Sequence, residues 1–113
     1  MIEIKPIEKV SGRVKIPGSK SYTNRALLIA ALAEGASYLE NPLISDDTNY
    51  MIQALKGFGV EVKEEPNVFI VFGKGGKLKI PAEEVFVGNA GTTMRFLTTF
   101  SSLAKGKVRL DGD

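Results

Sequence analysis

The chain has 113 residues, of which 43% are hydrophobic and 25% are charged, and its formal net charge is +2. These values are ordinary for one small globular domain, and so weak a net charge gives no reason to expect a nucleic-acid partner. The chain contains no Cys and no His, which excludes disulfides, thiolate nucleophiles, imidazole bases and the usual zinc sites, so acid–base chemistry must use Lys or carboxylates.

The N-terminal segment is expected to form two short strands. Polar and apolar residues alternate from Ile2 to Ile7, a turn follows at Ser11-Gly12, and the alternation resumes from Arg13 to Ile16. This alternation is unlike a signal peptide, and no apolar run reaches membrane-spanning length. We therefore expect a cytoplasmic protein with no membrane partner.

The stretch from Pro17 to Leu28, PGSKSYTNRALL, is expected to lead from the second strand into a helix. Pro17-Gly18 breaks the strand, and the run rich in Ala and Leu that follows favours a helix. The pattern predicts that this helix runs from about Ser21 to Ala33 and that Gly35 is its C-terminal cap.

The start of this helix is a candidate anion site. The first N–H groups of a helix have no partner and its N-terminal dipole end is positive, and Lys20 and Arg25 add full charges there. Phosphate or carboxylate would be the natural ligand, although a Ser-capped helix with two solvated bases would explain the same residues. The motif is not a P-loop, G-x-x-x-x-G-K-S/T, because the spacing from Gly12 to Gly18 is wrong and Ser19 separates Gly18 from Lys20.

A second helix is expected after a short strand from Ser37 to Glu40 and a turn at Asn41-Pro42. Ser45 is a good N-cap, and Asp46 and Asp47 would lie in the first turn. We favour this capping role over a metal or acid–base pair, since two Asp residues at a helix start need no ligand to explain them. An apolar stripe continues the helix to the glycines that end it: Met51, Ile52, Leu55, Phe58, Gly57 and Gly59.

A β-hairpin should follow the second helix. Its strands would run from Val60 to Lys63 and from Val68 to Phe72, joined by Glu64 to Asn67. The glycines from Gly73 to Lys77 do not fit a phosphate-cradling spacing, so this segment is interpreted as a mobile surface loop.

The last part of the chain repeats the order strand, turn, helix. A strand from Glu84 to Val87 leads into the turn from Gly88 to Thr93, where Gly88 and Gly91 would let backbone approach a ligand closely. This helix start is a second candidate anion site; the alternative is a tight turn with Thr caps. Arg95, expected in the first helical turn, would oppose the dipole and so needs a partner or a function. The apolar residues of the predicted helix are Met94, Phe96, Leu97, Phe100 and Leu103.

Three motifs together resemble one known family. PGSKSYTNRALL, SDDT at Ser45 to Thr48 and GNAGTTMRFL at Gly88 to Leu97 occur in the order found in the 3-phosphoshikimate 1-carboxyvinyltransferases, or EPSP synthases. The resemblance covers the chain from about Val10 to Asp113. It implies an α/β (α+β) fold made of the βαβαββ units of the two-domain enolpyruvyl transferases, present only in part. The related UDP-N-acetylglucosamine enolpyruvyl transferases share that fold but lack the K-S-x-x-N-R run.

The resemblance also implies substrates and a reaction. The enolpyruvyl group of phosphoenolpyruvate would pass to the 5-hydroxyl of shikimate 3-phosphate through a tetrahedral adduct, with release of phosphate and with no cofactor or metal. Two anionic substrates agree with two anion-ready helix starts, because the enzyme must hold both in register and move protons. The whole enzyme is expected to be a monomer and a target of the inhibitor glyphosate.

The family's roles are carried over where the motifs match. Lys20 would touch both substrates, and Ser21 and Arg25 would bind shikimate 3-phosphate. Gly91 would contact phosphoenolpyruvate, where glyphosate also lies. The remaining motif residues would shape the pocket: Asn89, Thr92 and Arg95. Phe96 departs from the pattern, since many members have Pro there, which could shift the first turn and the sensitivity to the inhibitor.

The resemblance further implies that this chain is an N-terminal piece of a longer enzyme. Residues 1–16 would belong with a domain completed by the later chain, residues 17–20 would form a hinge and substrate turn, and residues 21–113 would form one unit and the start of the next. The family's catalytic carboxylates and further arginines would lie beyond Asp113, so the piece alone should be inactive. The alternatives are a complete small enzyme domain, a non-catalytic anion-binding module, or an enolpyruvyl transferase with another substrate.

Overall fold

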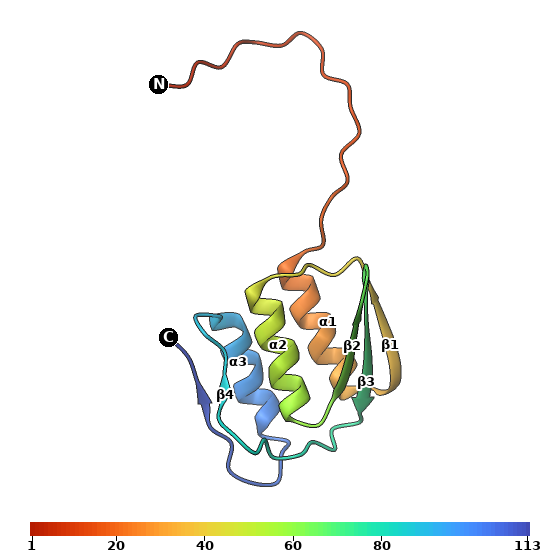
Figure 1. Cartoon of the computed structure of the whole chain (residues 1–113), viewed down its shortest axis with the longest axis vertical. Coiled ribbons are helices and arrows are strands. Elements are labelled where there is room, and N and C mark those ends of the chain that lie inside the picture. Colours follow the sequence, from red (N-terminus) through yellow and green to blue (C-terminus); the bar gives the residue numbers. More distant parts are fainter.

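The computed structural model describes residues 1–113 and combines three helices with five strands. In chain order the elements are α1 (Lys20–Leu32), β1 (Glu34–Glu40), α2 (Asp46–Gly57), β2 (Glu61–Glu65), β3 (Val68–Lys74), β4 (Val85–Phe86), α3 (Gly91–Ser101) and β5 (Leu110–Asp111). Figure 1 shows a layer of helices beside a small sheet, with the N-terminal segment extending away from both. No helix is long and apolar enough to cross a membrane.

The two strands expected before α1 are absent, so this prediction was wrong. Residues 1–19 contain no helix or strand, and all but the last few of them extend away from the folded body (Figure 1). A strand forms only when a neighbouring strand satisfies its N–H and C=O groups, and none of the five strands lies beside this segment. Its apolar side chains, which alternate as expected, are all exposed: Ile2, Ile4, Ile7, Val10, Val14 and Ile16.

The first sheet is antiparallel with the order β1-β3-β2. The hairpin of β2 and β3 confirms the prediction, and Asn67, with φ of 62°, occupies the turn. The expected mobile loop from Gly73 was partly wrong, because β3 continues to Lys74. Gly73 packs against the end of α1, where an added Cβ would lie 2.1 Å from the carbonyl oxygen of Ala33. This contact requires glycine and ties the sheet to the helix.

The helices begin close to the predicted positions, but α1 ends earlier than expected. Ala33 is its C-cap, and Gly35, with φ of 86°, already belongs to β1. The chain therefore turns directly from helix into strand without a glycine cap. The apolar stripe of α2 is confirmed, since all four of its predicted residues are fully buried: Met51, Ile52, Leu55 and Phe58.

The C-terminal part forms a small parallel unit in which α3 connects β4 to β5. β4 is shorter than expected, and β5 was not expected. Phe58 packs edge to face on Phe100 with 5.2 Å between the ring centres, which joins α2 to α3 in one core. The order αβαββ followed by βαβ confirms the expected mixed fold, present in part and without the first strand of its first unit.

Candidate functional site

All three helices begin at the same end of the molecule, the end from which the N-terminal segment leaves (Figure 1). The protein has only four buried polar side chains, and all of them lie near these helix starts: Thr23, Asn24, Thr48 and Thr93. Elsewhere the core is apolar. A core that is polar only where three positive dipole ends gather has the character expected of a site for anions.

The start of α1 is held by hydroxyl groups. The Oγ of Ser19 accepts a hydrogen bond from the N–H of Tyr22 at 3.4 Å, a long cap. Thr23 donates to the carbonyl oxygen of Ser19 at 2.8 Å and accepts from the N–H of Leu43 at 2.9 Å, which ties α1 to the segment before α2. Ser19 thus caps α1, which agrees with the Ser-capped helix that was considered as the alternative interpretation.

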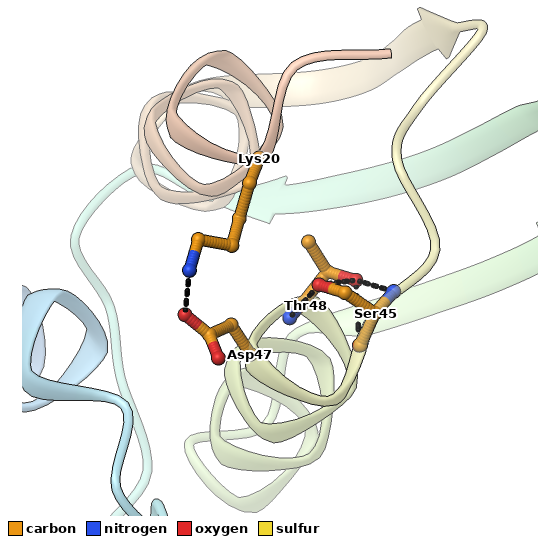
Figure 2. Close-up of polar contacts among 4 residues, drawn as sticks. All are labelled: Lys20, Ser45, Asp47 and Thr48. Atoms are coloured by element: carbon orange, nitrogen blue, oxygen red, sulfur yellow. Dashed lines mark hydrogen bonds and ion pairs between the residues drawn. The ribbon is translucent and has the colours of Figure 1, made fainter. Parts of the chain in front are cut away.

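Lys20 is the first residue of α1, and its ammonium is paired with a carboxylate of the next helix. Its Nζ lies 2.9 Å from Oδ2 of Asp47 (Figure 2). Ser21 and Arg25 follow on α1 and are exposed, and Arg25 belongs to none of the four ion pairs. Since they are four residues apart, they lie on one face of the helix.

The start of α2 is closed by its own side chains, as Figure 2 shows. Ser45 accepts from the N–H of Thr48 at 3.3 Å, and Thr48 accepts from the N–H of Ser45 at 2.9 Å, which together make a capping box. Asp46 and Asp47 lie in the first turn. The predicted N-cap at Ser45 and the predicted place of both Asp residues in the first turn are confirmed. The pairing of Asp47 with Lys20 was missed, because nothing in the sequence signals a contact between residues so far apart.

The start of α3 is open. Its N-cap is Ala90, with no side-chain hydrogen bond, so the alternative of Thr caps was wrong. The backbone N–H groups of Thr92 and Thr93 have no acceptor within the chain, and the buried Oγ1 of Thr93 has no partner either. Arg95 lies just beyond the first turn, exposed and outside every ion pair.

A pocket beside this turn brings together residues from the two ends of the parallel unit. It is lined by the turn, by Met94 and by the end of the chain: Gly88, Asn89, Ala90, Gly91, Leu110, Asp111, Gly112 and Asp113. Asn89 and Gly91 were expected site residues. No sequence pattern marked Asp111 and Asp113 as neighbours of this turn, and their carboxylates would repel an anion that entered the pocket.

The structure gathers the predicted residues at one end but in two groups. Lys20, Ser21 and Arg25 lie on α1, and the others lie in the turn before α3 or on that helix: Asn89, Gly91, Thr92 and Arg95. Between α1 and α3, farther from the helix starts, is an apolar pocket whose walls include Leu28, Leu32 and Phe96. By helical spacing, Leu28 and Leu32 continue the α1 face of Ser21 and Arg25.

These features describe an α/β protein whose three helix starts lie at one end and form a candidate site for anions. Residues 4–113 match the family model of EPSP synthase (3-phosphoshikimate 1-carboxyvinyltransferase), and the chain belongs to this family. Among curated relatives named 3-phosphoshikimate 1-carboxyvinyltransferase, that of Rhizobium leguminosarum bv. trifolii is 49% identical over 97% of this chain. That of Methanothermobacter thermautotrophicus is 45% identical over 92% of the chain.

Solved structures of EPSP synthase are also similar to this chain. The EPSP synthase of Acinetobacter baumannii is similar to this chain with a TM-score of 0.85 and 32% identity over 90% of the chain. The match covers 24% of that solved chain, and the Rhizobium match covers 26% of that relative. The present chain thus spans about a quarter of the length of the proteins that it matches.

Proposed function

We propose that this chain works as the N-terminal part of a longer enolpyruvyl transferase. The whole protein would transfer the enolpyruvyl group of phosphoenolpyruvate to the 5-hydroxyl of shikimate 3-phosphate and release phosphate. Family membership supports the reaction. The observation that carries the proposal is the gathering of three helix starts and Lys20 at one end, because both substrates are anions.

The candidate residues of α1 and those at the start of α3 would have different roles in the reaction. Lys20 would contact both substrates and offset negative charge as the tetrahedral adduct forms. Ser21 and Arg25, which share an exposed face of α1, would bind shikimate 3-phosphate, where the planar fork of Arg suits two oxygens.

The start of α3 would receive phosphoenolpyruvate. Gly91 would contact it, and the open N–H groups of Thr92 and Thr93 would donate to it. Asn89, Thr92 and Arg95 would shape the pocket. Glyphosate would bind at the same place.

The N-terminal segment would belong with a second domain. Residues 1–16 keep a strand-like alternation but expose every apolar side chain, which favours pairing with strands outside residues 17–113. The hinge would lie near Pro17-Gly18. Gly18 itself is anchored, since an added Cβ would lie 2.3 Å from the carbonyl oxygen of Asn41. A monomeric whole enzyme in the cytoplasm, with no nucleic-acid or membrane partner, remains our prediction.

Phosphate release by the whole protein, with both substrates supplied, tests this proposal. We expect release to require both phosphoenolpyruvate and shikimate 3-phosphate. We expect none from the 113-residue chain alone, because two charged substrates need more paired contacts than these helix starts offer. Release only with a different hydroxyl acceptor would favour an enolpyruvyl transferase of other specificity, and turnover by the 113-residue chain would make it a minimal enzyme.

A further inference from the structure

The ion pair between Lys20 and Asp47 joins the starts of two helices. Figure 2 shows the Lys20 side chain extending from the first turn of α1 toward α2, where the carboxylate of Asp47 meets its ammonium. The distance between Nζ and Oδ2 is 2.9 Å, a good charge-assisted hydrogen bond. The Lys20 side chain is 52% exposed and that of Asp47 is 21% exposed, so the ammonium keeps access to solvent on its other sides.

Asp47 is fixed in place more firmly than a surface carboxylate usually is. Its neighbours Ser45 and Thr48 close the capping box, which holds the first turn of α2. The bond from the N–H of Leu43 to Thr23 and the tight packing of Gly18 on Asn41 fix the two helix starts relative to each other. Asp47 therefore offers Lys20 a stationary partner.

Stability alone does not account for this arrangement. A partly exposed ion pair contributes at most about 1 kcal/mol to folding, and a Lys in the first turn of a helix opposes the helix dipole. Asp46 occupies the same first turn as Asp47 and complements the dipole of α2 equally well, yet it is exposed and makes no ion pair. What distinguishes Asp47 is its contact with Lys20.

We propose that Asp47 is a positioning residue that holds the ammonium of Lys20 for the transfer reaction. This inference rests on the proposed function, in which Lys20 touches both substrates. An ammonium has three N–H donors. One donates to Asp47, which leaves two, one for each anionic substrate. The side chain of Lys has much rotamer freedom to lose when it is ordered, and the pair with Asp47 orders it before the substrates arrive.

The carboxylate affects binding and turnover in opposite ways. Its negative charge opposes the approach of an anion, so its removal should not weaken substrate binding. Its loss would release the ammonium to sample other rotamers, and a catalytic group displaced by about 1 Å can cost about a hundredfold in rate. A positioning role thus predicts a lower kcat with an unchanged or lower KM.

The test compares Asp47→Asn with Asp46→Asn in the whole protein. For Asp47→Asn we expect kcat to fall about tenfold to a hundredfold while KM for either substrate rises by no more than about threefold. Asp46→Asn is the matched control, because it removes an equivalent charge from the same helix turn without touching Lys20. It should leave both constants within about twofold.

A double-mutant cycle separates positioning from a structural role. In a Lys20→Ala background, Asp47→Asn should have little further effect on kcat, because the group that it positions is gone. Equal kcat for Asp47→Asn and the parent, or equal losses for Asp46→Asn and Asp47→Asn, would overturn the inference, as would full additivity in the cycle. These outcomes leave the proposed function intact, whereas a parent protein that releases no phosphate from both substrates refutes the proposed function itself.

Discussion

The starts of α2 and α3 differ in how their unpaired N–H groups are satisfied. At α2, Ser45 and Thr48 bond reciprocally and two Asp residues follow, so the helix start is closed and carries negative charge. At α3, Ala90 offers no side-chain bond, and Thr92 and Thr93 keep free N–H groups. The start of α1 is intermediate, with a single exposed cap bond from Ser19 and the positive charge of Lys20.

This difference separates a structural helix start from one available to a ligand. A capping box stabilises a helix and occupies two of its free N–H groups, at α2 those of Ser45 and Thr48, and first-turn carboxylates repel an anion. An open start gives up that stabilisation, and it exposes donors at the positive end of the dipole. The protein thus has a closed start at α2, whose Asp47 pairs with Lys20, and an open one at α3, at the same end of the molecule.

The largest expected effect follows from removing the charge at α1. Lys20→Ala in the whole protein should lower kcat about a hundredfold to a thousandfold, the usual loss when a transition-state donor is removed. Lys56→Ala is a matched control, because Lys56 also pairs with a carboxylate, Glu64, at 3.0 Å, but in the last turn of α2. Steady-state phosphate release measures both. Activity of Lys20→Ala within about threefold of the parent would contradict its role.

Replacing Gly88 or Gly91, the two glycines around the start of α3, by alanine should affect the stability of the fold differently. Gly88 has φ of 53°, and an added Cβ would lie 2.7 Å from the ring of Tyr50, so Gly88→Ala should destabilise the fold by about 1–3 kcal/mol. Gly91 lacks a positive φ and faces open space, so Gly91→Ala should keep or slightly raise stability. Urea unfolding of the two variants measures this contrast.

In the whole protein the same Gly91→Ala change should nevertheless impair binding. The methyl group would occupy space where phosphoenolpyruvate presses on the open start of α3, so KM for phosphoenolpyruvate should rise and glyphosate inhibition should weaken further. Stable protein with altered constants would show that Gly91 serves the ligand and not the fold. An unchanged KM together with unchanged inhibition would refute the assignment.

The closed start of α2 should matter for folding. Ser45→Ala removes one half of the capping box and should cost about 1 kcal/mol of unfolding free energy. Ser19→Ala at α1 should cost about half as much, because its single cap bond is exposed to solvent, whereas the cap bond of Ser45 is partly buried. Equal costs, measured by urea unfolding, would mean that the starts of α1 and α2 are capped alike.

The sequence predicted what local chemistry determines. Ser45 with its two Asp residues, the apolar stripe of α2 and the hairpin turn at Asn67 each follow from a rule that acts within a few residues. The strands at residues 2–16 failed because a strand depends on partners that alternation alone does not supply. β5 was missed because its two residues, Leu110 and Asp111, carry no strand signal of their own.

In the site, too, features set by neighbouring residues were predicted and contacts between distant segments were not. The motifs marked the two helix starts correctly as polar turns, but the contact of Lys20 with Asp47 and the carboxylates of Asp111 and Asp113 near Asn89 depend on how distant segments pack. Sequence spacing carries no information on such contacts. The α3 start was predicted as an anion-ready turn with Thr caps as the alternative, and the absence of a side-chain cap there shows that the alternative was wrong.

The smallest expected effect is weak anion binding by the 113-residue chain. Measuring this binding residue by residue compares the three helix starts directly. In an NMR titration with sulfate, backbone amide signals should shift at Lys20 and Ser21 and at Thr92 and Thr93, because these starts offer donors and positive charge. We expect a dissociation constant of roughly 1 mM or weaker, since a solvated anion gains little from so few contacts. The amide of Thr48, which already donates to Ser45 beside two carboxylates, is the internal control and should not move. Equal shifts at Thr48 would indicate a general salt effect, whereas no shift at Lys20 or Thr92 would mean that the anion site needs the rest of the enzyme to form.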